Sequence, residues 1–191
     1  MVRAFADVAV PREVVDAVLD AGLRAPSAGF SQGWAFVVLE GREQTAPFWE
    51  LTAPITSAGG GRWGRRKQAP VLILPLANRQ AYVDRYAEPD KAALGLDPVA
   101  AWQAPYWLVD TSFATMTMLL AATNAGLGAL FFALGRDDRE LLAHLGVPGG
   151  YQAIGAIALG WPGDGDVRSG SLARGRRPRR ETVHYGRWAG A

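Results

Sequence analysis

The spacing of apolar residues changes along the chain, from helical near the start to almost continuous further on. Between Pro11 and Leu23 the apolar residues recur on one face, whereas Arg12, Asp16 and Asp20 lie on the opposite face. This spacing predicts an amphipathic helix. Pro11 suits its first turn, because the proline ring fixes the backbone angle that a helix start requires.

Four short apolar runs rich in strand-forming residues follow and predict buried strands. They span residues 34–39, 70–76, 127–134 and 152–159. Pro75 has no amide hydrogen to give to a sheet ladder, so we expect the second strand to fray there.

The run from Asp110 to Gly126 has the strongest helical signature. It is apolar or small on nearly every face and carries no charge after Asp110, which can cap its start. Such a helix is buried on most sides, which predicts a central helix, with a subunit interface as one way to cover it. Shorter helices are expected over residues 43–52 and 137–145.

Helices and strands alternate up to Pro162, which predicts one layered domain of the α+β or α/β class over residues 1–162. Residues 163–191 are rich in Gly and Arg and lack the apolar content of a second core. We expect them to form an extended C-terminal arm.

Three segments lack clear periodicity. Residues 24–34 form a polar loop that either connects two elements or walls a ligand site. Residues 78–105 mix aromatic residues with prolines and charges, and form either a helical lid over a pocket or a surface insertion with packed aromatics. The glycines at 58–61 precede no Lys-Ser/Thr pair and open no helix after a strand, which argues against a P-loop.

The composition excludes several kinds of chemistry. The 191 residues contain no Cys and two His, which excludes thiol nucleophiles and argues against a metal centre. The net charge is +2, with basic clusters at 62–67 and 168–180 that suit phosphate, but the basic tail lacks the aromatic platform of a nucleic-acid site. Without a signal peptide or an apolar stretch of ~18 residues, we expect a cytoplasmic protein that binds neither membrane nor nucleic acid.

The order of these features resembles the FMN-dependent nitroreductase family. The matching segments are Arg3-Ala4-Phe5, Ala25 to Trp34 (family pattern Ala-Pro-Ser-x-x-Asn-x-Gln-Pro-Trp), the apolar helix running into Gly126-Leu127-Gly128, the strand ending at Pro162, and Arg174 to Pro178 followed by Glu181 to His184. The resemblance implies an α+β fold and an intertwined homodimer with FMN between the subunits. The long apolar helix would then pack on its twin, and the arm would wrap the partner.

The resemblance also gives roles to individual residues. Arg3 matches a cation near the isoalloxazine ring, where it would stabilise negative charge on reduced flavin. The other cofactor-binding positions are Pro26, Ser27, Ala28 and Phe30 in a loop from the other subunit, Phe131, Phe132 and Ala133 beneath the ring, and Arg174 and Arg176 at the phosphate. Considered alone, the two phenylalanines would be core residues and the two arginines a solvated tail.

Three features depart from the family pattern. Phe30 stands where the family has Asn, which removes a polar contact to the ring. Gly33 stands where the family has Pro, which predicts a looser loop. The family's Arg-Arg-Ser triplet does not precede Arg3, so we expect either weaker FMN binding or compensation by the arginines of the arm.

The expected activity is that of an FMN-dependent oxidoreductase that takes hydride from NADH or NADPH and reduces nitroaromatic, quinone or related acceptors by a ping-pong mechanism. Trp102 and Tyr106 are candidate acceptor contacts. No catalytic residue is expected, because the cofactor carries the redox chemistry. A specialised flavin dehydrogenase or dehalogenase on the same fold, and a non-catalytic protein that sequesters FMN, remain alternatives.

Overall fold

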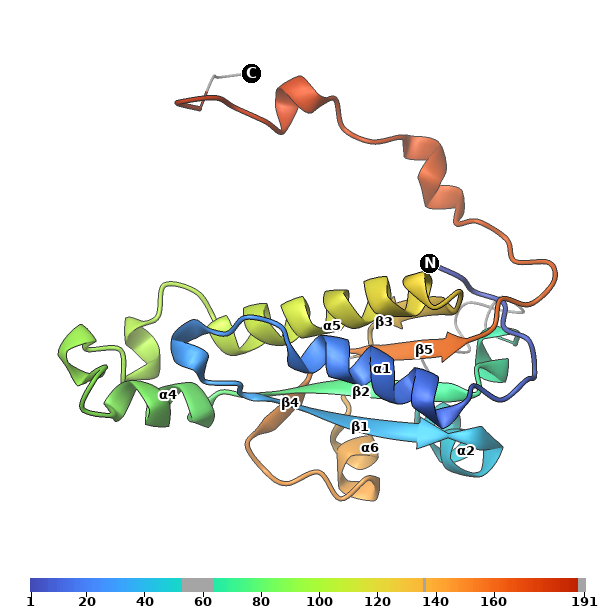
Figure 1. Cartoon of the computed structure of the whole chain (residues 1–191), viewed down its shortest axis with the longest axis horizontal. Coiled ribbons are helices and arrows are strands. Elements are labelled where there is room, and N and C mark those ends of the chain that lie inside the picture. The colour runs from blue at the N-terminus through green and yellow to red at the C-terminus, as the bar shows by residue number, and fades with distance from the viewer. Residues whose placement is uncertain (53–63, 136, 189–191) are drawn as a thin grey trace.

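The computed structural model describes residues 1–52, 64–135 and 137–188 (Figure 1). The glycine loop at 58–61 lies outside these ranges. Helices and strands alternate as the apolar pattern predicts. The helices are α1 (Arg12–Leu23), α2 (Gly41–Leu51), α4 (Gln80–Ala87), α5 (Tyr106–Asn124) and α6 (Arg139–His144). The strands are β1 (Trp34–Glu40), β2 (Val71–Asn78), β3 (Gly128–Phe132), β4 (Tyr151–Ala153) and β5 (Ala156–Gly160).

The strands form one antiparallel sheet in the order β1-β2-β5-β3, with β4 also paired to β2. All four predicted strands are present, but the run at 152–159 is split into β4 and β5. Helices cover both faces of the sheet, and this mixture of helix with antiparallel sheet confirms the α+β class.

The predicted fraying of the second strand at Pro75 is wrong, because β2 stays paired with β1 from Val71 to Ala77. In the adjacent β4–β5 segment, the three residues from Ile154 to Ala156 lie opposite the two residues Leu74 and Pro75. Gly155 takes a positive φ at this irregularity. Pro75 therefore lies beside a bulge, where the missing amide hydrogen breaks no regular ladder, and its carbonyl still accepts from Ile154 N–H at 3.1 Å.

Alternate residues of β2 divide the core into two layers. Val71 and Ile73 pack with α1 and α5 on one face, whereas Leu72 and Leu74 pack with α2 and the region of α6 on the other. Residues 71–77 are all buried, which explains why the strand reads as a continuous apolar run rather than an alternating one.

The two helices of the first layer approach each other closely at Gly22. A Cβ atom on Gly22 would lie 2.6 Å from Cγ of Met118, which is fully buried in α5. This contact holds α1 against α5 and fixes the loop that leaves α1 relative to the start of α5.

The long helix begins earlier than the sequence predicts. Pro105 is the N-cap residue of α5, and Asp110 is the fifth residue of the helix. The expected capping role of Asp110 is therefore wrong, because its carboxylate binds partners outside the helix. The face of α5 that points away from the sheet is apolar and exposed at Phe113, Met116 and Leu120.

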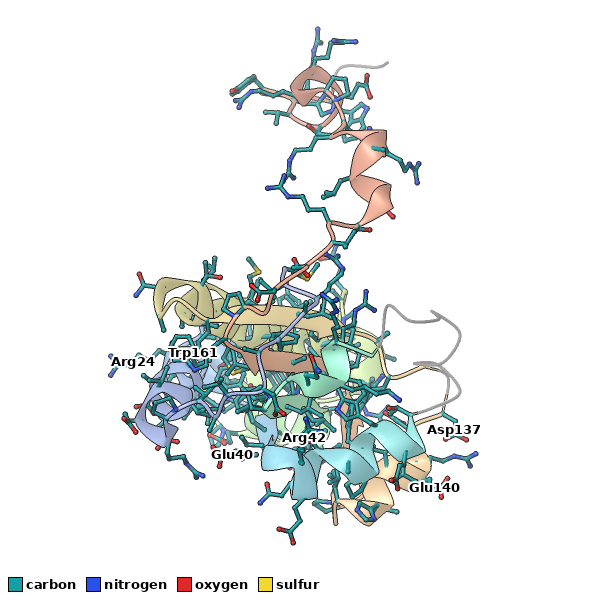
Figure 2. All side chains as sticks on the ribbon, turned by 90° about the vertical axis from the view of Figure 1, so that its right-hand side faces the viewer. Arg24, Glu40, Arg42, Asp137, Glu140 and Trp161 are labelled. Carbon is teal, nitrogen blue, oxygen red and sulfur yellow. The ribbon has the colours of Figure 1, made fainter. Side chains whose placement is uncertain are left out.

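The chain leaves the body after Gly163 and continues as an arm with two short 3-10 turns (Figure 1). Residues 170–188 are exposed except for His184, which is half-buried, and their side chains stand clear of the body (Figure 2). Leu172, Tyr185 and Trp188 are among the most exposed large apolar residues of the described chain. Within the described residues, no helix has both the length and the apolar character that a bilayer crossing demands.

Candidate functional site

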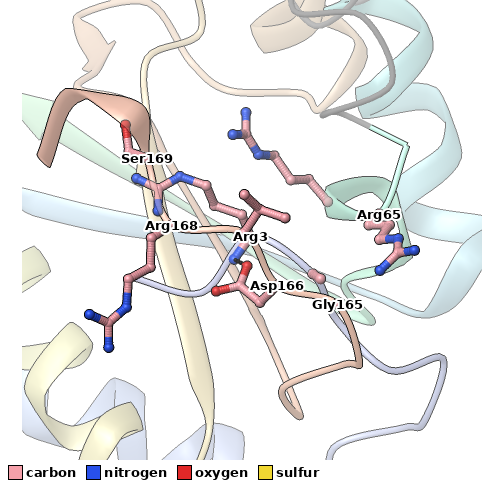
Figure 3. A pocket seen from close by; sticks show the side chains of 9 residues that line it. Arg3, Arg65, Gly165, Asp166, Arg168 and Ser169 are labelled. Carbon is pink, nitrogen blue, oxygen red and sulfur yellow. Dashed lines mark hydrogen bonds between the residues drawn. The ribbon is translucent and has the colours of Figure 1, made fainter. Parts of the chain in front are cut away.

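Arginines from three separate segments line one pocket of about 300 Å³ (Figure 3). Arg3 comes from the N-terminal segment before α1, Arg65 and Arg66 from the turn before β2, and Arg168 from the base of the arm. Ser169 and Asp166 also line it. Four guanidinium groups against one carboxylate give this pocket a net positive charge, which suits a phosphate group.

Backbone pairing of the N-terminal segment places Arg3 in this pocket. Ala6 N–H donates to the carbonyl of Trp161, and Gly163 N–H donates to the carbonyl of Ala4, both at 2.9 Å. Between them, the side chain of Phe5 is buried in the core. The Arg-x-Phe pattern therefore has a physical basis, because the buried ring anchors the strand-like segment that presents Arg3.

The hydrogen bonds of Arg3 and Arg65 decide how much of their positive charge is available to a ligand. Arg3 N–H donates to Asp166 Oδ1 at 2.7 Å, so part of that carboxylate is already engaged by backbone. Arg65 donates from Nη1 to the carbonyl of Asp164 at 2.6 Å, and its side chain is exposed. The Arg3 guanidinium itself donates from Nη1 to the carbonyl of Met1 at 3.3 Å. Both guanidinium groups thus donate to backbone carbonyls, which do not neutralise their charge.

The loop of residues 24–34 has an unusual backbone. Gly29, Phe30 and Gln32 have positive φ angles of 61°, 57° and 48°. Two internal hydrogen bonds brace the loop, from Ser31 Oγ to the carbonyl of Ala28 at 2.6 Å and from Gln32 N–H to Ser27 Oγ at 3.1 Å. Pro26 and the ring of Phe30 are exposed, whereas Ser27 and Ala28 are half-buried.

A buried carboxylate fastens this loop to the body. Asp110 Oδ2 accepts hydrogen bonds from Ala28 N–H and from the Tyr82 hydroxyl, both at 2.8 Å. Asp110 is 2% exposed and Tyr82 is fully buried. Burial and the hydrogen bond to Asp110 raise the pKa of Tyr82, so its hydroxyl stays protonated and remains a donor.

Gly33 does not loosen the loop, contrary to the expectation from the missing proline. A Cβ atom there would lie 2.5 Å from the ring of Tyr82, so the backbone packs directly on that ring. The carbonyl of Gly33 also accepts from Asn78 N–H at 2.7 Å. The absence of a side chain thus permits tight packing at this end of β2.

The segment after β2 is helical in part and gathers its aromatic residues beside the loop. Trp102 lies 4.7 Å from Tyr86, 5.8 Å from Tyr82 and 5.6 Å from Tyr106, measured between ring centroids. Trp102 is half-buried, and Tyr106 is 38% exposed. The structure therefore brings both candidate acceptor residues together, next to the loop that contains Phe30.

The three residues assigned beneath the flavin differ in accessibility. The Phe132 ring is buried on the α2 side of the sheet, stacked on Trp49 at 5.7 Å. Its ring belongs to the core, so a cofactor contact would have to use its backbone. Phe131 is half-buried and packs against Gly155, and Ala133 is exposed just beyond β3.

Arg174 and Arg176 lie on the exposed arm, beyond the residues that line the pocket. Within one chain they do not meet Arg3. The sequence reasoning noted both basic clusters but missed Arg65, Arg66 and Arg168 as site residues. The sequence shows the two basic clusters but not that the fold brings them together, so the pocket follows only from the structure.

The chain segments that line the basic pocket and the loop of residues 24–34 lie at opposite ends of the sheet (Figure 1). Arg65 and Arg66 precede β2, whereas Gly33 is bonded to Asn78 at its last residue. Eight strand residues span roughly 25 Å. The two regions of one chain therefore cannot both surround the same small part of a ligand.

Comparisons with known proteins agree with this fold. Residues 1–161 match the sequence model described as "Nitroreductase family". Two curated relatives, from Archaeoglobus fulgidus and Methanothermobacter thermautotrophicus, are each named "Putative NADH dehydrogenase/NAD(P)H nitroreductase". They are 26% and 28% identical over 85% of this chain and over 80% and 73% of their own lengths. A solved structure described as an "oxidoreductase containing FMN" matches all of this chain and 89% of its own with a TM-score of 0.73, at 24% identity, which shows a shared fold.

Proposed function

The chain belongs to the nitroreductase family, and on that premise we propose that it is an FMN-dependent oxidoreductase. It would take hydride from NADH or NADPH and reduce nitroaromatic, quinone or related small acceptors by a ping-pong mechanism. The observation that supports the proposal most directly is the pocket formed by Arg3, Arg65, Arg66 and Arg168. The names of the curated relatives, which include both NADH and NAD(P)H, support a nicotinamide donor.

The pocket fits the phosphate of FMN. Guanidinium groups donate in forked pairs that match phosphate oxygens, and the arginines of this pocket come from segments that approach it from different sides. Ser169 adds a hydroxyl donor. Bound FMN would supply the hydride chemistry, and from its place in this pocket Arg3 would bind the phosphate end rather than the isoalloxazine ring that the family resemblance implies.

We further propose that a second copy of the chain completes each site. The loop with Pro26, Ser27 and Ala28 is too far from the basic pocket of its own chain, so it would serve the pocket of the partner. Phe113, Met116 and Leu120 form an exposed apolar stripe on α5 that a twin helix would cover. The arm, with Arg174 and Arg176, has few contacts with its own body and would lie on the partner.

In this arrangement the protein's own residues bind and orient rather than exchange protons. The arginines hold the phosphate end, the partner's loop closes over the ring and excludes water, and the aromatic residues near Trp102 bound the space for an acceptor. Phe131 and Ala133 lie at the end of β3, where the backbone would support the ring from below.

The test starts with purified protein and its flavin absorbance in the visible region. We expect a yellow protein, or a colourless one that FMN reconstitutes, which NADH or NADPH bleaches without oxygen and a quinone or nitroaromatic then reoxidises. Size-exclusion chromatography with light scattering should give twice the mass of one chain. Colour without bleaching would favour a flavin-sequestering protein, and a protein that cannot be reconstituted would overturn the proposal.

A further inference from the structure

Phe30 combines two features that a simple connecting loop does not require. The residue is 74% exposed, the highest value among the aromatic residues that the structure describes between residues 1 and 162. Its backbone has a φ of 57°, in the left-handed region where a bulky side chain is strained. An exposed ring gains nothing from core packing, so the fold of the single chain does not account for a strained phenylalanine here.

The surrounding structure holds the backbone of Phe30 in place from both sides. Before it, Ala28 N–H donates to Asp110 and the carbonyl of Gly29 accepts from Arg85 Nε at 2.9 Å. After it, Gln32 N–H donates to Ser27 Oγ. Local strain persists only where neighbouring contacts fix it, and these three bonds do so.

The loop that carries Phe30 lies next to a group of aromatic rings. A Cβ atom on the preceding residue, Gly29, would lie 2.7 Å from the ring of Tyr86, so the loop rests on that ring. Tyr86 in turn packs edge-on against Trp102, and Trp102 against Tyr106. Phe30 therefore follows directly on the residue that rests on this group of rings, which includes the two candidate acceptor contacts.

We propose that Phe30 is a specificity-determining residue whose ring contacts planar aromatic acceptors, and that the bonds to Asp110 and Arg85 keep it exposed for this role. The proposal rests on the proposed flavin function, in which this loop reaches the site of the partner. A phenyl ring offers a flat apolar face and no hydrogen bond. It would favour quinones and nitroaromatics over small inorganic acceptors, which gain nothing from stacking.

Three variants separate the ring from the backbone. Phe30→Ala removes the ring, Phe30→Asn removes it and tolerates positive φ, and Phe30→Tyr keeps it as the matched control. Steady-state kinetics with menadione as planar acceptor and ferricyanide as inorganic acceptor, the rate of flavin bleaching by NADH, the Kd for FMN and the melting temperature are measured for each.

We expect the KM for menadione to rise about three- to tenfold in Phe30→Ala and Phe30→Asn and to stay near wild type in Phe30→Tyr, because a stacked aromatic pair is worth about one order of magnitude at most. The ferricyanide KM and the bleaching rate should change by less than the menadione KM, because neither depends on stacking of a planar acceptor on the ring. Phe30→Asn should melt about 2–3 °C above wild type, because Asn relieves the backbone strain.

An unchanged menadione KM in both ring-free variants would overturn the acceptor role. A higher Kd for FMN with an unchanged menadione KM would make Phe30 a cofactor contact instead, which also overturns it. A melting temperature of Phe30→Asn below that of wild type would overturn the claim that the Phe30 backbone is strained to keep the ring exposed. Failure of the proposed flavin function would show in the wild-type protein, as absence of bleaching by NADH. The acceptor role of Phe30 would then be wrong as well. The melting temperatures would still test whether the Phe30 backbone is strained.

Discussion

The two ends of the sheet are built in opposite ways. At one end, Arg3, Arg65 and Arg168 come from three segments and meet with little internal compensation of their charge. At the other end, Asp110 and Tyr82 are almost completely buried and satisfy each other and the backbone of the loop.

This difference separates binding from stability. Solvated arginines that face a pocket add little to folding, because exposed charges interact weakly across water. The same charges gain strongly from a phosphate held among them. The buried Asp110–Tyr82 pair behaves in reverse, since it stabilises the fold and reaches a ligand only through the loop. Substitutions at the two ends should therefore change different measurements.

The largest effect is expected when the basic end is neutralised. Each charge-assisted hydrogen bond to phosphate contributes about 1.5–3 kcal/mol, so the double variant Arg65→Gln/Arg168→Gln should bind FMN about 100-fold more weakly or worse. Its melting temperature should stay within about 2 °C of wild type. Quenching of FMN fluorescence on titration measures the affinity.

Arg139→Gln is the matched control for this double variant. Arg139 is exposed on α6 and pairs with Asp137, outside the pocket. Its loss removes one positive charge without touching the basic end, so the FMN affinity should remain close to wild type. Equal weakening in the control and the double variant would mean that net charge, rather than the pocket, attracts the cofactor.

The sequence predicts the elements of this fold well and its local exceptions poorly. The apolar runs locate the strands because burial on both faces leaves a continuous signature, as in β2. The same pattern cannot show the bulge opposite Pro75, which depends on the register of β5 and β4. It also cannot show that Asp110 serves a loop, because a carboxylate near a helix start has the same appearance whether it caps or reaches away.

The candidate site is predictable only where function leaves a local pattern. Arg3 and the loop of residues 24–34 belong to recognisable motifs, and their order along the chain led to the family. Arg65 and Arg168 enter the same pocket through long-range folding, which no local pattern encodes. Tyr82 is a similar case, since a tyrosine in an irregular segment gives no sign that its hydroxyl meets a carboxylate on another helix.

A smaller effect on binding, but a larger one on stability, is expected from Asp110→Ala. The change leaves the Tyr82 hydroxyl and Ala28 N–H buried without their acceptor, at about 1–3 kcal/mol for each unsatisfied group. We expect a loss of about 2–4 kcal/mol in the free energy of unfolding by urea. Ser112→Ala, on the exposed side of the same helix, should change it by less than about 0.5 kcal/mol. Equal losses in the two variants would show that Asp110 does not fasten the loop.

The smallest effect is a dependence on alkaline pH that distinguishes Tyr82 from its surroundings. Burial, together with the bond to Asp110, raises the pKa of Tyr82 above its ordinary value of 10.0, so the folded state holds this proton more tightly than the unfolded state. The resulting stability is fully present below pH 10 and decreases as the pH rises through the range above it, by up to about 1.4 kcal/mol per pH unit.

Tyr82→Phe removes this proton and leaves the ring packing largely intact. At neutral pH the variant should be less stable than wild type by about 1 kcal/mol, the usual contribution of one hydrogen bond. Above pH 10 the difference should shrink, because only the wild type has the Tyr82 proton to lose, while the other tyrosines titrate in both proteins and cancel. Urea unfolding from pH 8 to about pH 11 measures the two curves. A gap that stays constant over this range would mean that the hydroxyl is open to water, and the contrast between the buried end and the basic end would then fail at its central residue.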